Sequence, residues 1–182
     1  MSRERSILKA AAEAFYEKGF HGVGVDELGV RAGLKGPSIY RHFSSKDEIL
    51  AALLDEALDE LMSATEPVYA DPARDLERAI RHHIDFAITR RQLVLIYQRD
   101  VGSVVDPWRS AFTRRRAEYD ARWEALFVAR YPSLDNGTAA TVSQACLGMI
   151  FSTASWPARA AGAAHVPETL ERLVFEGLSG LE

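Results

Sequence analysis

The sequence has little of what marks a secreted or membrane-spanning protein. Its 182 residues include one cysteine, Cys146, which cannot form an intramolecular disulfide and is expected to pack as a small apolar side chain. No apolar run approaches the roughly 18 residues that a membrane span needs. The first five residues are too polar to open a secretory signal. We therefore expect a soluble, cytoplasmic protein that does not enter a membrane.

Motifs of catalysis and of nucleotide or metal binding are also missing. There is no G-x-S-x-G and no Walker loop, and the pair Gly22 and Gly24 is followed by Glu27 where a dinucleotide-binding loop has its third glycine. His82 and His83 are adjacent rather than four residues apart, so they do not aim at one metal ion. We expect neither an enzyme nor a metal site or cofactor. Four carboxylates at helical spacing are better explained as a charged outer face: Asp55, Glu56, Asp59 and Glu60.

The chain does contain enough apolar residues for a buried core and an uneven distribution of charge. Hydrophobic residues make up 47% of the sequence, and the formal net charge is -4. Residues 1–50 carry eight lysines and arginines against seven carboxylates, whereas the remainder carries 14 against 19. A near-neutral head on an acidic body permits contact with nucleic-acid phosphates at one end of the chain and discourages it elsewhere.

Helical periodicity dominates the first 60 residues. Apolar residues recur at helical spacing from about Arg3 to Lys18, and a short second helix is expected from Val25 to Ala32. A glycine turn separates it from a brief third helix, roughly Pro37 to Phe43, since proline is tolerated in a first helical turn. The S-x-x-E pattern of Ser45 to Glu48 is a capping box that predicts the start of a fourth, long helix.

The remaining chain is also predicted to be helical, after a linker at 67–72. Further helices are expected around Gln92 to Tyr97, from Trp108 to Arg130, from Thr138 to Trp156 and from Pro167 onward. No convincing strand pattern is present. The predicted fold class is all-α, with about nine helices: a three-helix head, residues 1–45, joined to a larger helical ligand-binding and dimerisation body, residues 46–182.

The second and third predicted helices have the anatomy of a helix-turn-helix. Two short helices flank a glycine turn, and small or polar residues open the second of them. Such an opening lets the helix approach the edges of bases, which bulky apolar side chains would obstruct. Arg41 can reach phosphate or guanine, and Ser38, Tyr40 and His42 can donate to phosphate oxygens. Phe43 is better explained as part of the core, whereas Tyr40 fits either role.

The N-terminal 50 residues resemble the TetR family of transcriptional regulators. The resemblance rests on Ile7-Leu8-Lys9-Ala10-Ala11, Phe15, Gly19-Phe20, Tyr40-Arg41-His42-Phe43 and Lys46-Asp47-Glu48-Ile49-Leu50. It implies a repressor that binds double-stranded operator DNA. The residues implied to contact DNA are Lys35, Gly36, Pro37, Ser38, Tyr40, Arg41, His42 and Lys46. Gly24 and Lys35 depart from the family's usual helix caps, which leaves the operator sequence open.

Large aromatic side chains are concentrated in the middle of the helical body. Each could be ordinary core, but together they suggest an apolar cavity in which polar groups such as Tyr119, Gln98 or Arg99 orient a ligand. The resemblance places the inducer of TetR proteins in the same region. The predicted effector is a small hydrophobic molecule of unknown identity. The predicted ligand-binding residues are Phe86, Tyr97, Trp108, Phe112, Tyr119, Trp123 and Phe151.

The last two long helices, 138–156 and 167–178, are expected to form a homodimer as an intersubunit four-helix bundle. Small residues on the first of them allow another helix to come close. Two alternatives stay open at this point. One is a helix-turn-helix protein controlled by a protein partner rather than by a small molecule, and the other is an enzyme with a helical active site.

Overall fold

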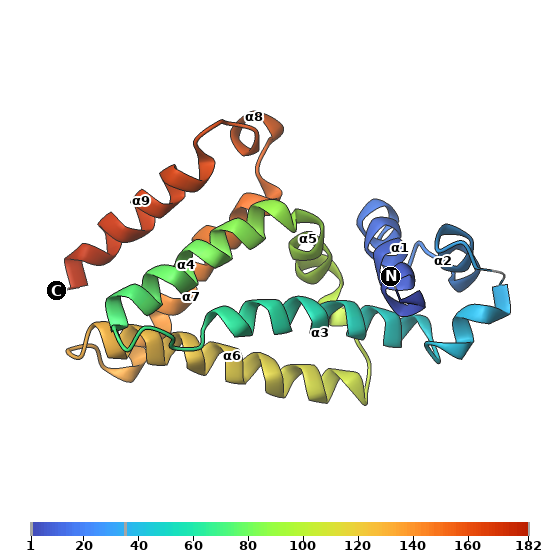
Figure 1. Ribbon diagram of the computed structural model, residues 1–182, viewed down its shortest axis with the longest axis horizontal. Coiled ribbons are helices and arrows are strands. Elements are labelled where there is room, and N and C mark those ends of the chain that lie inside the picture. The colour runs from blue at the N-terminus through green and yellow to red at the C-terminus, as the bar shows by residue number, and fades with distance from the viewer. Residues whose placement is uncertain (1, 35, 182) are drawn as a thin grey trace. The chain divides into compact units, whose positions relative to one another are not determined.

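The computed structural model describes residues 2–34 and 36–181, and within these ranges the chain is helical and holds no strand (Figure 1). The all-α prediction with about nine helices is confirmed. None of the described helices is both long and apolar enough to cross a bilayer. The α-helices are α1 (Arg3–Lys18), α2 (Val25–Arg31), α3 (Lys46–Ala64), α4 (Pro72–Thr89), α5 (Arg91–Asp100), α6 (Trp108–Arg130), α7 (Asn136–Ser152), α8 (Ala158–Ala161) and α9 (Val166–Leu178).

Capping side chains fix where several of these helices begin. The Ser45 hydroxyl accepts a hydrogen bond from the Glu48 N–H at 3.1 Å, which confirms the predicted capping box at the start of α3. The Glu48 carboxylate makes the second bond of the box, since it accepts from the N–H of Ser44, the residue before Ser45, at 2.6 Å. Asp71 and Asp135 cap α4 and α7 in the same way.

The third predicted helix differs in type and extent from the expectation. Residues Gly36–Arg41 form a 3-10 helix, η1, rather than an α-helix from Pro37 to Phe43. The His42 N–H and the Phe43 N–H both bond to the Ile39 carbonyl, at 3.0 and 3.1 Å, so the chain turns away directly after η1. A 3-10 helix, with hydrogen bonds from residue i to residue i+3, is typical of short helical segments, and η1 is six residues long.

Backbone contacts divide the chain into two compact units. Unit 1 comprises Met1–Leu58 and Gln92–Arg114, and unit 2 comprises Asp59–Arg91 and Arg115–Glu182. Unit 1 therefore contains α1, α2, η1, the first part of α3 and nearly all of α5. In unit 2, α4 packs against α7 and α9 (Figure 1). The functional division at residues 45 and 46 stays a prediction.

Candidate DNA-binding surface and candidate ligand site

A glycine turn and two buried side chains hold η1 in place. Gly33 has a φ of 68°, a backbone conformation that residues with a side chain rarely adopt. The Leu34 N–H donates to the Gly29 carbonyl at 2.8 Å and closes the turn after α2. Ile39 is fully buried, and Phe43 is buried as the sequence predicted. The short η1 helix is thus anchored from beneath, and its polar residues are left at the surface.

The polar residues predicted to contact DNA share this short element. Tyr40 is 56% exposed, so it belongs to the surface rather than to the core, and Arg41 is exposed beside it. Ser38 and His42 are half-buried. Gly36 and Pro37 lie in the first turn of η1, whereas Lys35 lies outside the described residues. The arrangement offers a cation, a phenol and further donors to a polyanion.

Val30, which the sequence pattern did not single out, is 75% exposed on α2. Val30 follows Leu28 by two residues, and this spacing places two side chains on nearly opposite faces of a helix. Because Leu28 is buried, the same spacing predicts that Val30 is exposed. An exposed valine beside polar neighbours can make apolar contact with a thymine methyl group. Val30 therefore joins η1 as a candidate part of the DNA-binding surface.

Lys46 has a structural role in unit 1. Its ammonium donates to the carbonyls of Phe20 and Val23, both at 2.9 Å, and lies 4.3 Å from the centre of the Phe20 ring. These bonds hold the start of α3 to the segment between α1 and α2. An ammonium has three N–H donors, so contact with a phosphate is compatible with both bonds and stays a prediction.

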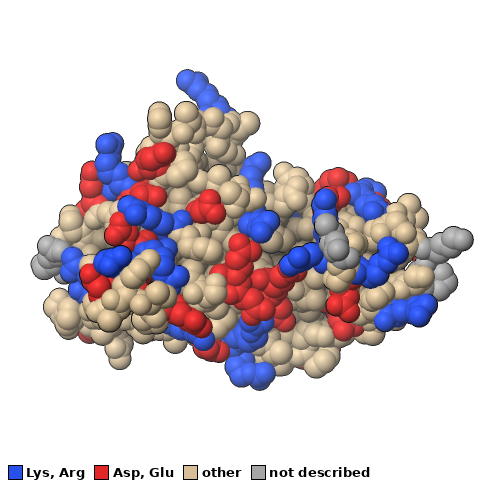
Figure 2. Space-filling view, in the orientation of Figure 1, with Lys and Arg blue, Asp and Glu red and all other residues tan. Residues whose placement is uncertain are grey.

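Several other cations of the head are paired with carboxylates of the same unit. Arg31 lies 2.8 Å from both Glu17 and Glu27, and Lys18 lies 2.7 Å from Glu27. The hydrogen bond from Arg31 lowers the pKa of Glu17, and that from Lys18 lowers the pKa of Glu27. Arg41, in contrast, makes no ion pair within the described ranges. Figure 2 shows cationic and anionic side chains interspersed over the visible face of the molecule.

Arg99, considered above as a group that orients a ligand, is committed within unit 1. Its guanidinium donates to the carbonyls of Phe15 and Tyr16, in the last turn of α1. It also lies 2.9 Å from the carboxylate of Asp100, which is buried. Beyond α5, Ser103 lies 3.0 Å from a ring nitrogen of His21. The segment 99–103 is thus fastened to the end of α1.

The seven aromatic residues predicted to bind a ligand fall into both units. Tyr97, Trp108 and Phe112 belong to unit 1, where the rings of Tyr97 and Phe112 have centres 6.2 Å apart. The other four belong to unit 2: Phe86, Tyr119, Trp123 and Phe151. Within unit 2 the rings of three of these four surround a residue considered above only as a poor metal ligand, His83.

His83 lies at the centre of the aromatic cluster of unit 2. Its ring centre is 4.8 Å from that of Trp123, 5.8 Å from that of Tyr119 and 6.1 Å from that of Phe151. Nδ1 lies 2.7 Å from the Ala79 carbonyl, which can only accept, so Nδ1 carries the proton. Burial lowers the pKa of His83 to about 3, and the ring is therefore neutral at pH 7. Burial also raises the pKa of Tyr119.

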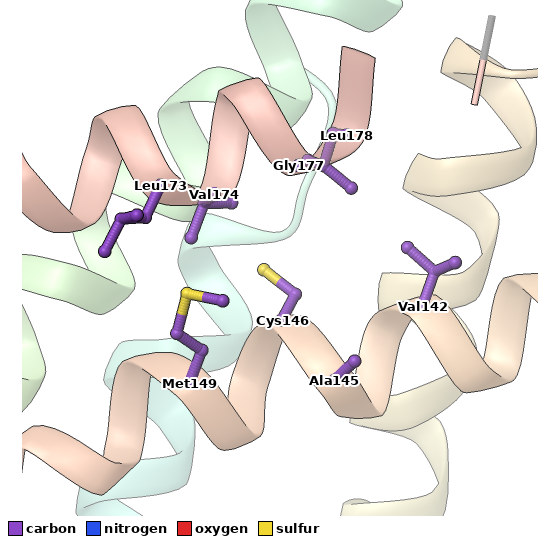
Figure 3. Close-up of a pocket in the computed structure, with 8 residues that line it drawn as sticks. All are labelled: Val142, Ala145, Cys146, Met149, Leu173, Val174, Gly177 and Leu178. Atoms are coloured by element: carbon purple, nitrogen blue, oxygen red, sulfur yellow. The ribbon is translucent and has the colours of Figure 1, made fainter. Parts of the chain in front are cut away.

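A shallow apolar groove of about 210 Å³ separates α7 from α9 (Figure 3). Met149 is 41% exposed and Leu173 is 53% exposed, although both are large and apolar. Cys146 points from α7 toward α9 and is buried, and burial raises the pKa of its thiol to about 12. Within the described ranges, no three metal-binding side chains gather at one point. The groove is lined by Val142, Ala145, Cys146, Met149, Leu173, Val174, Gly177 and Leu178.

Comparison with known proteins covers both parts of the chain. Residues 7–53 match the family model of bacterial regulatory proteins of the tetR family, and residues 69–174 match the tetracyclin repressor-like C-terminal domain. The transcriptional activator FasR of Mycolicibacterium smegmatis is 37% identical over 87 residues, which is 46% of this chain and 40% of FasR. The repressor KstR2 of Mycobacterium tuberculosis is 30% identical over 125 residues, covering 63% of this chain and 59% of KstR2.

The whole fold matches a solved TetR-family structure. The regulator PfmR of Thermus thermophilus superposes with a TM-score of 0.79 at 25% identity, covering 97% of this chain and 98% of PfmR. The matches to FasR and KstR2 are shorter than this structural match. The chain spans about two fifths of the length of FasR and three fifths of that of KstR2. The C-terminal family model alone matches more than half of the chain. The chain therefore belongs to the TetR family of bacterial regulatory proteins.

Proposed function

We propose that the protein is a DNA-binding transcriptional repressor that releases its operator when a small apolar molecule binds in the helical body. The observation that carries the proposal is the exposed pair Tyr40 and Arg41 on η1, held by the buried Ile39 and Phe43. In this proposal residues 1–45 bind DNA, and residues 46–182 bind the ligand and form the dimer. The protein acts in the cytoplasm, where its operator lies.

Each polar group of η1 has a place in the proposed DNA contact. The Arg41 guanidinium makes a bidentate contact with guanine or a charge-assisted one with phosphate. The hydroxyls of Ser38 and Tyr40 and the ring N–H of His42 donate to phosphate oxygens, which positions the head on the duplex. Val30 of α2 adds an apolar contact to this proposed set of DNA-binding residues: Lys35, Gly36, Pro37, Ser38, Tyr40, Arg41, His42 and Lys46.

A second copy of the chain is the proposed occupant of the α7–α9 groove. The exposed Met149 and Leu173 are apolar surface that a dimer would bury. In the proposed dimer each copy of the chain contributes one η1 to the same duplex. For successive major grooves the half-sites are about 34–36 Å apart, which predicts a palindromic operator.

Release of the operator follows if the ligand favours a different conformer of the body. The helix α3 contributes residues to both units, so a change in its position affects the head as well as the body. A ligand can shift such an equilibrium only by its difference in affinity for the two conformers. The relatives include an activator, FasR, and a repressor, KstR2. Transcription from the operator with and without the protein distinguishes the proposed repression from activation.

The test is operator affinity at fixed salt, with the operator first selected from random duplex DNA. Arg41→Ala should weaken binding about 5- to 150-fold, which is the loss expected for one strong base or phosphate contact. Arg159→Ala, which removes an exposed arginine of α8, is the matched control and should change the affinity less than twofold, that is, by under about 0.4 kcal/mol. A wild-type protein that is monomeric and prefers no duplex sequence would overturn the proposed function.

A further inference from the structure

Four charged side chains join α1 to α2 on the surface of unit 1. The guanidinium of Arg31 donates to Glu17 at 2.8 Å and to Glu27 at 3.1 Å. The ammonium of Lys18 donates to the same oxygen of Glu27 at 2.7 Å. Two positive and two negative charges therefore cancel at this place. We call the group the α1–α2 ion-pair network: Glu17, Lys18, Glu27 and Arg31.

The network lies beside the candidate DNA-binding surface. Val30 and Arg31 follow Glu27 by three and four residues, so Glu27 is one turn of α2 away from each of them. Val30 is 75% exposed and is a candidate for contact with bases. The side chains of Glu27 and Arg31 retain 29% and 25% of their exposure to solvent. Because screening at physiological salt acts over about 8 Å, charges at these positions affect nearby phosphates of bound DNA.

Unit 1 thus has cations of two kinds near the proposed DNA contact. Arg41 is exposed and has no ion pair within the described ranges, whereas Lys18 and Arg31 are held by carboxylates. The pKa of each of these carboxyl groups is lowered by its hydrogen bond to a cation, so both are ionised at pH 7. A cation released from such a pair can neutralise a phosphate at any base sequence, since phosphates carry no sequence information.

We propose that Glu17 and Glu27 determine the specificity of DNA binding, because they hold the two cations of the network away from phosphates. A non-specific complex can shift along the duplex to registers in which a released cation meets a phosphate. In the operator complex η1 fixes the register, so a released cation gains a contact only where a phosphate already lies within its reach. The two carboxylates therefore weaken non-specific binding more than operator binding.

The inference rests on the proposed function in one respect, that unit 1 binds DNA. It adds two residues that act by withholding charge from the duplex rather than by contacting it. Exposed ion pairs contribute little to stability, so variants of the network should keep the urea midpoint of the wild type. Changes in DNA binding can then be assigned to charge rather than to folding.

The test compares affinity for the selected operator with affinity for a scrambled duplex of equal length and composition, over a range of salt concentrations. Glu27→Gln removes the carboxylate partner of Lys18 and leaves Arg31 with Glu17. It should strengthen binding to scrambled DNA by up to about eightfold in about 0.1 M salt, and steepen the slope of log affinity against log salt by about 0.9, as one additional phosphate contact does. The operator-to-scrambled ratio should fall severalfold.

Two further variants assign the effect to the released cations. The double variant Glu17→Gln, Glu27→Gln releases both cations and should steepen the slope by about 1.8, twice the value for one contact. The double variant Lys18→Gln, Glu27→Gln should return the slope for scrambled DNA to that of the wild type. Glu13→Gln makes the same change of charge one turn before Glu17 on α1, where the exposed Glu13 has no ion pair within the described ranges. This control should leave the slope unchanged.

The outcomes separate this inference from the proposed function. A wild-type protein that prefers its operator to scrambled DNA supports the proposed function whatever the variants do. Slopes that are unchanged in Glu27→Gln, or that steepen equally in Glu13→Gln, overturn the inference and leave operator binding intact. Equal strengthening of operator and scrambled binding also overturns it, because the carboxylates would then lower affinity without adding specificity. A wild type without any preferred duplex overturns the proposed function, and this inference with it.

Discussion

The two units of this protein differ in how their polar side chains are hydrogen-bonded. In unit 1 long cationic side chains are tied to the fold, since Lys46 donates to two carbonyls and Arg99 donates to the end of α1. In the core of unit 2, His83 lies among aromatic rings, and its Nε2 lacks a hydrogen-bond partner within the described ranges. A fully bonded network fixes one geometry, whereas unbonded buried groups destabilise the fold unless another molecule pairs them.

This difference matches the demands of the two proposed tasks. Reading base edges requires that the side chains of η1 keep fixed positions, because contacts with bases lose energy quickly when they are displaced. Control by a ligand requires a region whose stability changes when the ligand is present. The comparison therefore predicts that unit 1 tolerates substitution in its polar network poorly, and that unit 2 responds strongly to the state of its buried groups.

Arg99→Ala should have the largest effect on stability. The substitution leaves the buried Asp100 carboxylate without its cation and removes donors from the last carbonyls of α1. Breaking a buried ion pair costs about 3–5 kcal/mol, and the partial exposure of Arg99 reduces the expected loss to about 3 kcal/mol or less. Urea unfolding measures it, with Arg5→Ala on the exposed side of α1 as the control. Equal midpoints for both variants would show that the network of unit 1 contributes little.

Gly22→Ala should destabilise unit 1 by about 2 kcal/mol, since forced backbone shifts of this kind typically cost about 1–3 kcal/mol. A β-carbon at this position would lie 2.4 Å from the Lys18 carbonyl oxygen, so the backbone must move. The same change at Gly102, where a β-carbon would meet nothing within 4 Å, is the matched control. Operator affinity should fall with stability for Gly22→Ala only. A folded Gly22→Ala protein with unchanged affinity would argue against a rigid head.

Local patterns in the sequence predict most of the helices, because caps and glycine stops act over a few residues. The boundaries of the first helix and of the helix from Trp108 to Arg130 agree with the structure to the residue. The prediction was wrong for the type and extent of the third helix, which is the 3-10 helix η1, because a periodic pattern over so few residues does not distinguish a 3-10 helix from an α-helix. The division of the chain into two units depends on contacts between residues far apart in the sequence. The helical periodicity of apolar residues does not predict such contacts.

The candidate sites, too, could be predicted from the sequence only where local patterns determine them. Exposure of Tyr40 and Arg41 follows from their place beside an apolar anchor, so a helix-turn-helix pattern suffices to nominate them. The role of His83 does not follow from the sequence, because adjacent histidines have no characteristic function when their surroundings are unknown. Only the packing of α4 against other helices of unit 2 shows that one of the two rings lies among Tyr119, Trp123 and Phe151.

His83 offers the smallest and most specific test of the comparison, through the dependence of stability on pH. Its pKa is lowered from about 6.5 in the unfolded chain to about 3 in the fold, chiefly by burial. As the pH falls below 6.5 the unfolded chain takes up a proton that the folded protein does not, so the stability due to neutral His83 is present above the unfolded pKa and is lost as the pH falls toward 3.

Between about pH 7.5 and about pH 5.5 this linkage should lower the free energy of unfolding by about 1.4 kcal/mol in the wild type. His83→Phe keeps an aromatic ring against Trp123 and removes the titration, so its unfolding free energy should lack this part of the pH dependence. His165→Phe, which removes a histidine exposed beside α9, is the control and should retain it. If His83→Phe and wild type lose the same free energy over this range, the folded protein takes up a proton at His83 as readily as the unfolded chain does. That result would contradict the lowered pKa expected from the burial of His83.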